Sequence, residues 1–350
     1  MASNKFTLGA TGDVLLHKRL YTKAMTEDGT GYNFDNMLEE AEKLFDEDHL
    51  IIVNLESIIA GKEFGLADFP RFNSPEEIGY KLKDMNVDIV NIANNHILDH
   101  GEEGLLKSLD NLNNIGLPYV GGYRSIEDQE TVRLFQKNGL KVCFLSYTMS
   151  MGVGSRPKGK RYLVNKYSDV GAPKLRRIIN KIRKQLDVDV VVVSLHFGKE
   201  YQMLPTSSQL EISYSVADAG ADVIIGHHPH VLQPPNILVD SRGREVFVAY
   251  SLGNFFSGQI GLYRQIGAYL TIDIEKDFTT NSSLLKFSNP KMQLTYVDSS
   301  HKKDYKLRLL KDVVEASPVI KTNIGEFPSE KVYERMKNHM RYWLSDLDVS

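Results

Sequence analysis

The sequence is short of several features that commonly define a class of protein. It contains one cysteine, Cys143, in an apolar run, so no disulfide can form within the chain and any metal site must use oxygen and nitrogen ligands. No stretch approaches the roughly 20 apolar residues that a membrane span needs. The first residues lead almost directly into a strand-like run, which leaves no room for a signal peptide. We therefore expect no membrane segment in this chain. A cytoplasmic location is the default, and an extracellular, anchored one would require an anchor that has been removed.

An excess of one charge is also lacking. The 42 Lys and Arg residues nearly balance the 45 Asp and Glu residues, which gives a formal net charge of -3. This balance provides no general attraction to nucleic acid, so we expect no nucleic-acid partner. Internal repeats, heptads and low-complexity tracts are absent as well, and an apolar fraction of 42% suits a sizeable folded core.

What the sequence does contain is a series of six apolar, β-type runs, each of which ends in a polar cluster. Runs of Val and Ile without polar alternation suit strands that are buried on both faces of a sheet. In such sheets, ligands bind beyond the carboxyl ends of the strands. The polar clusters are Gly12-Asp13, Asn54-Leu55-Glu56, Asn94-Asn95-His96, His196, Gly226-His227-His228-Pro229-His230 and Ser251-Leu252-Gly253-Asn254. Carboxylates, amides and imidazoles delivered to one edge predict a metal site.

Helix-like segments separate these runs, which predicts an α/β fold built in layers. Apolar spacing and end signals predict helices at residues 34–47, 74–86, 102–115, 173–186 and 207–219. Ser74, Pro75 and Glu77 have the pattern of a helix start with a capping box, and Gly116 is a good helix stop.

The pattern changes near residue 276. We expect a core over residues 1–275, followed by a C-terminal extension over residues 276–350 that packs on the core. The extension has polar, alternating segments and then a helix over about residues 329–344.

The residue types at the strand ends suit borderline divalent ions such as Mn, Fe, Co or Zn. We predict one or two such ions, held by carboxylates, one amide and imidazoles: Asp13, Glu56, Asn95, His196, His228 and His230. Two adjacent ions need a shared carboxylate, which would be Asp13 or Glu56. Such a pair lowers the pKa of a bound water.

Each cluster also has a purely structural interpretation. A single His at a strand end is usually structural, and Asn94-Asn95-His96 could be a turn whose side chains bond the backbone. Asp13 could be an ordinary turn residue, and His17 and His227 could pack or bond locally. The segment 226–230 is harder to explain in this way, because three His within four residues are difficult to bury without partners. The joint occurrence of six such clusters favours a site.

His96 directly follows a predicted ligand and is expected to point away from it, toward substrate. We predict that His96 is the general acid or stabilises the transition state, with Asp99 orienting its ring. Two long loops, residues 57–73 and 148–168, should overhang the same edge. The predicted substrate-binding residues lie on or beside these strands and loops: Asn54, Arg71, Glu200, Asn254, Arg156, Lys158, Lys160 and Arg161. The basic ones, with Lys62, would form an electropositive rim, unless they are only a solvated loop surface.

Together these clusters resemble the motifs of a known family. The motifs occur in the same order in the CapA family, which is associated with poly-γ-glutamate capsule synthesis in bacteria; they are Gly12-Asp13, Asn54-Leu55-Glu56, Ala93-Asn94-Asn95-His96, Asp99-His100-Gly101, Ser194 to Tyr201, Gly226 to His230 and Tyr250 to Phe255. The resemblance covers roughly residues 5–275. That family in turn is similar to the calcineurin-like metallophosphoesterases, which implies a four-layered α/β/β/α sandwich around a two-metal site.

Carried over position by position, the resemblance implies the same ligand set, with Asn95 as the ligand Asn and His96 as the catalytic His. Two positions depart from the pattern of the metallophosphoesterases. The pattern has a His two residues after the first Asp, but here the first His after Asp13 is His17. Glu56 stands at the position where the pattern usually has a bridging Asp.

Three functions are implied. The first is a metal-dependent hydrolase or transferase acting on an anionic polymer such as poly-γ-glutamate, which would be the partner of this chain. The second is a non-catalytic component of a capsule-synthesis complex that binds or assembles the polymer. The third is a metal-dependent phosphodiesterase. An intact ligand set in a chain without a membrane anchor favours an enzyme.

Overall fold

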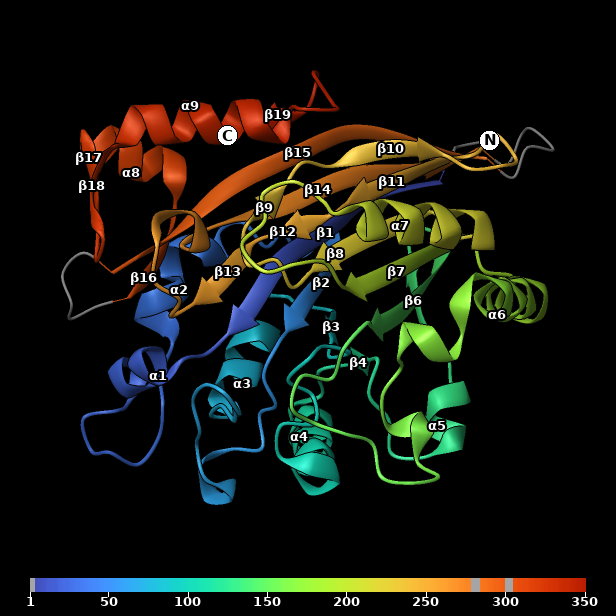
Figure 1. The fold of residues 1–350 in the computed structure, drawn as a ribbon, viewed down its shortest axis with the longest axis horizontal. Coiled ribbons are helices and arrows are strands. Elements are labelled where there is room, and N and C mark those ends of the chain that lie inside the picture. The colour runs from blue at the N-terminus through green and yellow to red at the C-terminus, as the bar shows by residue number, and fades with distance from the viewer. Residues whose placement is uncertain (1–3, 278–283, 300–304) are drawn as a thin grey trace.

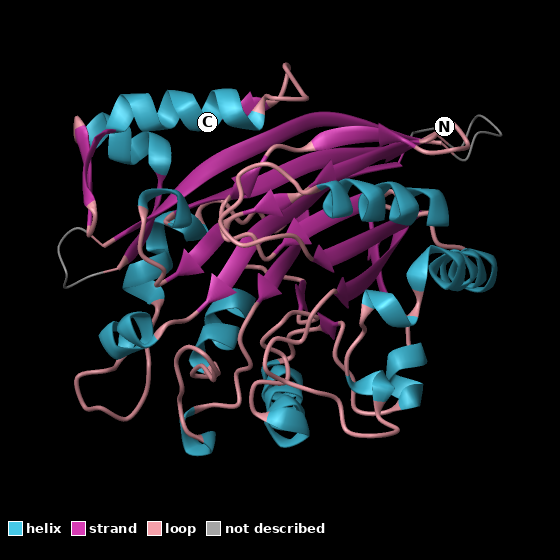
Figure 2. Cartoon of the chain, viewed as in Figure 1, coloured by secondary structure: helices cyan, strands magenta, loops and turns pink. Residues whose placement is uncertain are grey.

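The computed structural model describes residues 4–277, 284–299 and 305–350. Two β-sheets lie face to face in the centre of the molecule, and helices cover their outer faces (Figure 1). Long strands dominate the centre, while helices and loops lie outside them (Figure 2). The predicted four-layered α/β/β/α architecture is therefore confirmed.

The first sheet has nine strands in the order β16-β15-β14-β1-β2-β3-β4, with β13 paired to β1 and β19 paired to β15. Their bounds are β1 (Asn4–Leu15), β2 (His49–Leu55), β3 (Ile89–Asn91), β4 (Tyr119–Val120), β13 (Asn254–Ser257), β14 (Ile266–Lys276), β15 (Leu285–Asp298), β16 (Lys306–Leu309) and β19 (Asp348–Val349). Strands β1 to β4 and β13 are parallel, so their carboxyl ends meet at one edge.

The second sheet has six strands in the order β10-β11-β8-β7-β6-β5. Their bounds are β5 (Arg133–Lys137), β6 (Leu140–Thr148), β7 (Val190–His196), β8 (Val223–His227), β10 (Asn236–Val239) and β11 (Glu245–Ala249). The four central strands are parallel, and the antiparallel strands β5 and β10 lie at the two edges. The predicted runs of Val and Ile thus form the buried parallel strands of both sheets.

Side-chain alternation explains the layers. Along β7, Val190 and Val192 pack between the two sheets, while Val191 and Val193 pack under the outer helices. The helices over the second sheet are α6 (Gly171–Leu186) and α7 (Ser207–Ala219). Those against the outer face of the first sheet are α1 (Lys18–Ala24), α2 (Asp35–Glu42), α3 (Glu77–Asp84) and α4 (Gly101–Ile115). Burial of each large aliphatic side chain contributes roughly 1.5–3 kcal/mol to this packing.

The helix ends show where local signals decide the structure. Helix α4 ends at Gly116, whose φ of 71° is left-handed, as predicted. The capping box predicted at Ser74 is wrong, because α3 begins at Glu77 without a side-chain cap and the Ser74 hydroxyl lies 2.7 Å from that of Ser57. Helix α2 is also shorter than predicted.

The C-terminal residues do more than cover the core. Strand β15 runs antiparallel to β14 and pairs with it at both ends, from Lys276↔Leu285 to Ile266↔Tyr296. Residues beyond 276 therefore supply strands of the first sheet. They also supply α8 (Leu310–Ala316), α9 (Ser329–Met340) and the hairpin of β17 (Val319–Thr322) and β18 (Gly325–Pro328).

The remaining short elements connect these layers: α5 (Ile126–Glu130), β9 (Leu232–Gln233), β12 (Ser251–Leu252) and the 3₁₀ turns η1 (Lys62–Phe64), η2 (Arg161–Leu163), η3 (Tyr167–Asp169) and η4 (Leu262–Arg264). Across the described ranges, the helices are all too short or too polar to cross a membrane.

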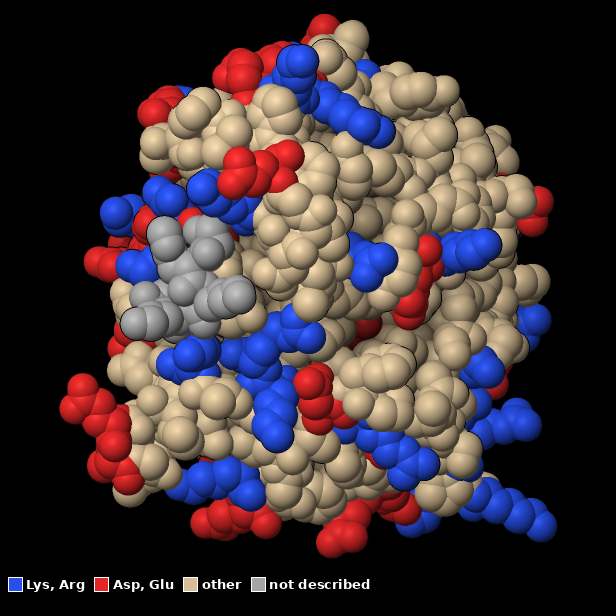
Figure 3. All heavy atoms as spheres, turned by 60° about the vertical axis from the view of Figure 1, so that its left-hand side comes forward, with Lys and Arg blue, Asp and Glu red and all other residues tan. Residues whose placement is uncertain are grey.

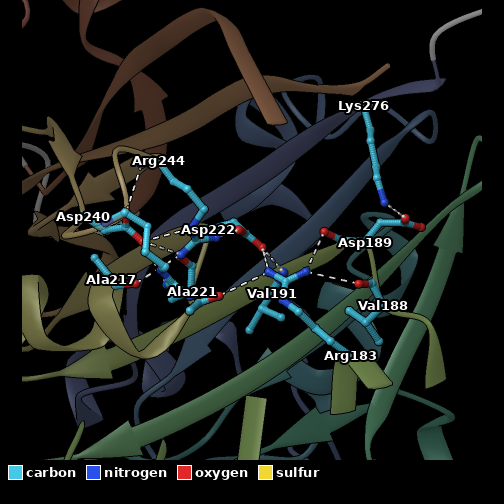
Figure 4. Close-up of polar contacts among 12 residues, drawn as sticks. Arg183, Val188, Asp189, Val191, Ala217, Ala221, Asp222, Asp240, Arg244 and Lys276 are labelled. Atoms are coloured by element: carbon cyan, nitrogen blue, oxygen red, sulfur yellow. Dashed lines mark hydrogen bonds and ion pairs between the residues drawn. The ribbon is translucent and has the colours of Figure 1, made fainter. Parts of the chain in front are cut away.

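A cluster of buried charge lies at the amino ends of β7 and β8 (Figure 4). Asp222, next to β8, forms ion pairs with Arg183 and with Arg244, the latter at 2.9 Å, and accepts a 2.8 Å hydrogen bond from Val191 N. Asp240 also pairs with Arg244 at 2.9 Å. Asp189, next to β7, is 2.5 Å from Lys276 Nζ. These contacts tie α6, the two strands and the β10–β11 hairpin together.

Candidate metal centre

The carboxyl ends of the parallel strands bring the predicted ligands to one place. Asp13 lies near the end of β1, in register with Asn54 on β2 and Asn254 on β13. Glu56 follows β2, Asn95 follows β3 and His196 ends β7. The arrowheads of β1, β2 and β7 point the same way in Figure 1. His228 and His230 lie in the turn directly after β8.

Two overlapping groups of ligand atoms form the centre. Atoms of Asp13, Glu56 and His196 lie within 4.8 Å of one another, and so do atoms of Glu56, His228 and His230. Glu56 is the residue that the two groups share. Its Oε1 lies 3.4 Å from His196 Nε2 and 3.6 Å from His230 Nε2.

The position of Asn95 adds an amide oxygen to this centre. Its Oδ1 lies 2.7 Å from His196 Nε2. All six predicted ligands are thus brought together, and each ligand type suits a borderline divalent ion.

Glu56 is the least satisfied group in the centre. It is fully buried, and neither carboxylate oxygen has a hydrogen-bond partner among the described residues. Burial, and then the charge of Asp13, raises the pKa of Glu56 well above its usual value. Burial also pushes the pKa of Asp13 upward, but hydrogen bonds from His227 and His230 outweigh it and hold that pKa well below normal. Two neighbouring buried carboxylates of this kind fit a divalent cation.

Two imidazoles, those of His196 and His230, turn their Nε2 atoms toward Glu56. His230 Nδ1 lies 3.0 Å from Asp13 Oδ2 and 3.0 Å from Asn254 Oδ1, and since both oxygens are acceptors, Nδ1 carries the proton. The other ring nitrogen of His230, Nε2, therefore faces Glu56. Burial lowers the pKa of His196, and burial lowers that of His228 to about 4, so both are neutral near pH 7, the form that binds a metal.

The turn after β8 is conformationally unusual. His228 has a φ of 98° and His230 a φ of 57°, and both values lie in the left-handed region that residues other than glycine seldom occupy. Backbone strain of this kind concentrates at functional sites. It turns both rings to one side, with their centres 6.0 Å apart.

His96 lies beside the ligand groups without belonging to either. Its Nδ1 is 2.7 Å from Asp99 Oδ2, which also accepts a 2.7 Å hydrogen bond from Phe72 N. The ring of Phe72 packs edge-on against His96 at 4.7 Å. These contacts fix the His96 ring and direct its Nε2 away from Asp99, toward Asn95, whose Nδ2 is 3.2 Å away.

Two residues predicted to bind substrate lie behind the ligands instead. Asn54 and Asn254 are fully buried. Asn54 Nδ2 donates a 2.7 Å hydrogen bond to Asp13 Oδ1, while Asn254 holds His230. The structure thus gives them an orienting position, because neither side chain is reachable by a large molecule.

His227 was expected to pack or bond locally, away from the other imidazoles. The structure places it inside the network, with Nδ1 3.4 Å from Asp13 Oδ1 and Nε2 3.2 Å from Asn91 Nδ2. Sequence reasoning missed Asn91 and could have found it, because Asn91 is a polar residue at the carboxyl end of β3 (Ile89–Asn91). His17 contributes to neither ligand group, and its Nδ1 faces Leu15 O at 3.2 Å.

The predicted basic rim is partly neutralised. Arg156 forms an ion pair with Asp169, and Lys160 forms one with Glu102 at 2.6 Å. Arg71, Lys158 and Arg161 are exposed. On the face drawn in Figure 3, Lys and Arg side chains alternate with Asp and Glu and form no continuous basic band.

The two long loops do lie near the centre. Gly152 packs against the Asn95 carbonyl and Gly154 against Leu98, so the loop 148–168 contacts the turn that carries His96. The other loop reaches the same turn through Phe72. Glu200, also predicted to bind substrate, is exposed, and its charge contributes to the raised pKa of Glu56.

Comparisons with known proteins agree with this picture. The family described as "Bacterial capsule synthesis protein PGA_cap" matches residues 7–259. The PGA biosynthesis protein CapA of Bacillus subtilis (strain 168) is 31% identical over 252 residues, which cover 71% of this chain and 62% of that protein. The capsule biosynthesis protein CapA of Bacillus anthracis is 28% identical over 264 residues, which cover 73% of this chain and 61% of that protein. The chain spans less than two thirds of the length of either relative.

A solved structure, the calcineurin-like phosphoesterase YfkN from Bacillus subtilis, aligns with 97% of this chain and 99% of its own, at 14% identity and a TM-score of 0.45. The family match is the stronger finding, since residues 7–259 include every predicted metal ligand. This chain belongs to the bacterial capsule synthesis protein PGA_cap family.

Proposed function

We propose that the chain is a metal-dependent hydrolase or transferase that acts on an anionic capsule polymer such as poly-γ-glutamate. The observation that carries the proposal is Glu56, which is fully buried and has no hydrogen-bond partner on either oxygen among the described residues. A buried carboxylate without partners is strongly unfavourable unless a proton or a cation neutralises it, and the neighbouring ligand-type side chains favour a cation here. The polymer is suggested by the name of the relative from Bacillus subtilis, a PGA biosynthesis protein.

One or two divalent ions such as Mn, Fe or Zn would be held by the six ligands already named, with Glu56 between the two groups. Bound there, such ions would polarise the scissile group and lower the pKa of a water to near neutrality. The carboxylates and neutral imidazoles of the chain supply ligands without thiolates.

The residues of the chain divide the remaining work. His96 is held by Asp99 through Nδ1, so its Nε2 faces the site and would give a proton to the leaving group from the imidazolium form of the ring. Asn54 and His227 orient Asp13 from behind. Asn254 fixes the tautomer of His230, as outer hydrogen bonds commonly do for metal-binding imidazoles.

A second candidate function is a metal-dependent phosphodiesterase with a smaller substrate. The ion pairs of Arg156 with Asp169 and of Lys160 with Glu102 favour it, because they remove two of the charges that a long polyanion would meet. The single experiment that tests both candidates starts from protein purified without chelators or nickel resin. Its metal content is measured, and turnover of poly-γ-glutamate is compared with turnover of bis(4-nitrophenyl) phosphate.

Turnover of the polymer supports the first candidate, and turnover of the phosphodiester alone supports the second. Metal and polymer binding without turnover would point to a non-catalytic component of capsule assembly. Protein that takes up no divalent ion contradicts both enzymatic candidates.

A further inference from the structure

Beside the candidate metal centre, an arginine is stacked on an exposed tyrosine. The guanidinium carbon of Arg264 lies 3.9 Å from the centre of the Tyr201 ring. That ring lies 6.3 Å from the ring of His230. Tyr201 follows β7, and Arg264 ends η4, so two segments far apart in the sequence meet at the rim of the centre.

Both residues are anchored to the ligand segment. The Asn254 side chain accepts from His230 Nδ1 and donates a 2.8 Å hydrogen bond from Nδ2 to the carbonyl of Arg264. Tyr201 N donates a 2.8 Å hydrogen bond to Pro229 O, next to His230. The φ of Tyr201 is 64°, so its ring is presented by a strained backbone. The pair is therefore held in a fixed relation to the metal ligands.

The guanidinium of Arg264 has no protein acceptor within the described ranges. No hydrogen bond or ion pair from its side chain to any described residue is present, and its contact is the ring of Tyr201. By contrast, Arg156, Arg183 and Arg244 are all paired with carboxylates. Tyr201 is 41% exposed and Arg264 is half-buried, so the stacked pair reaches solvent. A planar guanidinium in this situation offers its fork of N–H donors to an incoming group.

Carboxylate and phosphate groups are the natural occupants of such a fork, because both accept two parallel hydrogen bonds from a guanidinium. Glu200 is adjacent to Tyr201, and its negative charge acts on Tyr201 together with the positive charge of Arg264. The Glu200 carboxylate therefore opposes any long-range attraction of anions to the stacked pair. Binding therefore depends on an oxyanion that reaches Arg264 itself.

We infer that Arg264, backed by Tyr201, binds an oxyanion carried by the substrate next to the bond that is broken. The inference rests on the proposed function, because it takes the metal centre as the place of reaction. Every residue of a γ-linked glutamate polymer carries one free carboxylate, and a phosphate-bearing substrate offers the same chemistry. The substrate class is thus one with an anionic substituent adjacent to the scissile group.

Two pairs of probes test this with metal-loaded protein. The first pair is a γ-linked glutamate pentamer and the same pentamer with α-carboxamides, compared by calorimetric titration. The second pair is the 4-nitrophenyl ester of thymidine 5′-phosphate with and without a 3′-phosphate, compared by kcat/KM. The variants are Arg264→Gln, Arg264→Lys and the matched control Arg177→Gln, which alters an exposed arginine on α6 over the outer face of the second sheet.

We expect the parent to prefer the charged member of one pair, which tells a carboxylate substrate from a phosphate substrate. Arg264→Gln should reduce that preference by about tenfold, at the lower end of the range for charge-assisted hydrogen bonds because the site is exposed. Arg264→Lys should retain part of the preference, and Arg177→Gln all of it. Metal content should be unchanged in all three variants.

An unchanged preference in Arg264→Gln overturns the assignment, and so does a parent without preference in either pair. These failures are distinct from failure of the proposed function. That function is tested separately by metal content and by turnover of poly-γ-glutamate.

Discussion

Two clusters of buried charge lie at opposite ends of the strands β7 and β8, and they are built in opposite ways. At the amino ends, Asp222 and Asp240 meet guanidinium groups and backbone N–H groups (Figure 4). At the carboxyl ends, neither oxygen of Glu56 has a hydrogen-bond partner within the described ranges, and the imidazole nitrogens of His196 and His230 lie 3.4 and 3.6 Å from Oε1. The carboxylates of the amino-end cluster are paired within the chain, whereas Glu56 in the carboxyl-end cluster needs a partner that the described residues do not supply.

The pKa values of the carboxylates follow this difference. Burial pushes the pKa of Asp240 upward, but the N–H groups and side chain of Arg244, with the N–H of Arg242, outweigh it and lower that pKa to about 2. Burial and the charge of Asp13 raise that of Glu56. Unpaired buried charge is costly, whereas buried charge that is paired within the chain can be purely structural. The presence of buried charge alone therefore does not mark a binding site. What marks it is charge without a protein partner.

The strongest test of this difference between the two clusters is Glu56→Gln, which removes the unpartnered charge. We expect metal affinity to fall by more than about 100-fold, because loss of even an outer partner of a ligand costs 10- to 100-fold. Any metal-dependent rate should fall with it. The measurement is metal content after dialysis, beside turnover of whichever substrate the parent accepts.

The matched control is Glu103→Gln, which makes the same change at an exposed position on α4. It should leave metal content unaltered. If Glu56→Gln retains as much metal as the parent, Glu56 is not a ligand and the contrast between the two clusters loses its meaning.

The next largest effect is expected at the other end of the strands. Asp222→Asn leaves Arg183 without its carboxylate and Arg244 with Asp240 alone, and breaking a largely buried pair of this kind typically costs about 3 kcal/mol of folding free energy. Metal content should not change. Urea unfolding of the metal-free protein measures the first quantity. A stable variant with reduced metal content would show that the two clusters are not independent.

His96→Asn separates ligand from proton donor within the carboxyl-end cluster. We expect metal to be retained and turnover to fall on the order of 100-fold, the usual scale for a general acid. The matched control is His100→Asn, four residues further on, whose ring faces Arg71 O at 3.3 Å. Loss of metal from His96→Asn would make His96 a ligand, and full activity would remove it from the mechanism.

Much of this arrangement could be predicted from sequence because it depends on local order. Within each sheet, parallel strands deliver their carboxyl ends to one edge, and the face-to-face packing of the two sheets brings Asp13 of the first to His196 of the second. The end of α4 at Gly116 depends only on neighbouring residues. The layered fold and the assembly of six ligand-type side chains follow from such rules.

The rest depends on contacts between distant segments, which periodicity does not encode. The Ser74 hydroxyl contacts that of Ser57 instead of capping the predicted helix, and the charge of Lys160 is paired with that of Glu102. His227 ends β8 on the same face as Val223 and Ile225, between the two sheets, and the left-handed turn at His228 breaks the alternation only after it. No local signal predicts that Arg264 stacks on Tyr201.

The smallest expected effect is on the pH dependence of the free energy of unfolding, to which the two clusters contribute with opposite signs. The folded pKa of Glu56 is raised above its unfolded value near 4.5, so between the two values the folded metal-free chain binds more protons than the unfolded one. Its contribution to stability is therefore lost as pH rises above about 4.5. Asp240 has a folded pKa lowered from 3.8 to about 2, so its contribution is present above 3.8 and is lost as pH falls toward 2.

The measurement is the free energy of unfolding of the metal-free parent, Glu56→Gln and Asp240→Asn from pH 3 to 7. The difference between each variant and the parent isolates the contribution of that carboxyl group. We expect the gain in stability of Glu56→Gln over the parent to grow with pH, and the deficit of Asp240→Asn to shrink in acid. Parallel curves for the parent and Glu56→Gln would mean that Glu56 is solvated in the metal-free protein, and the carboxyl-end cluster would then be as self-sufficient as the amino-end one.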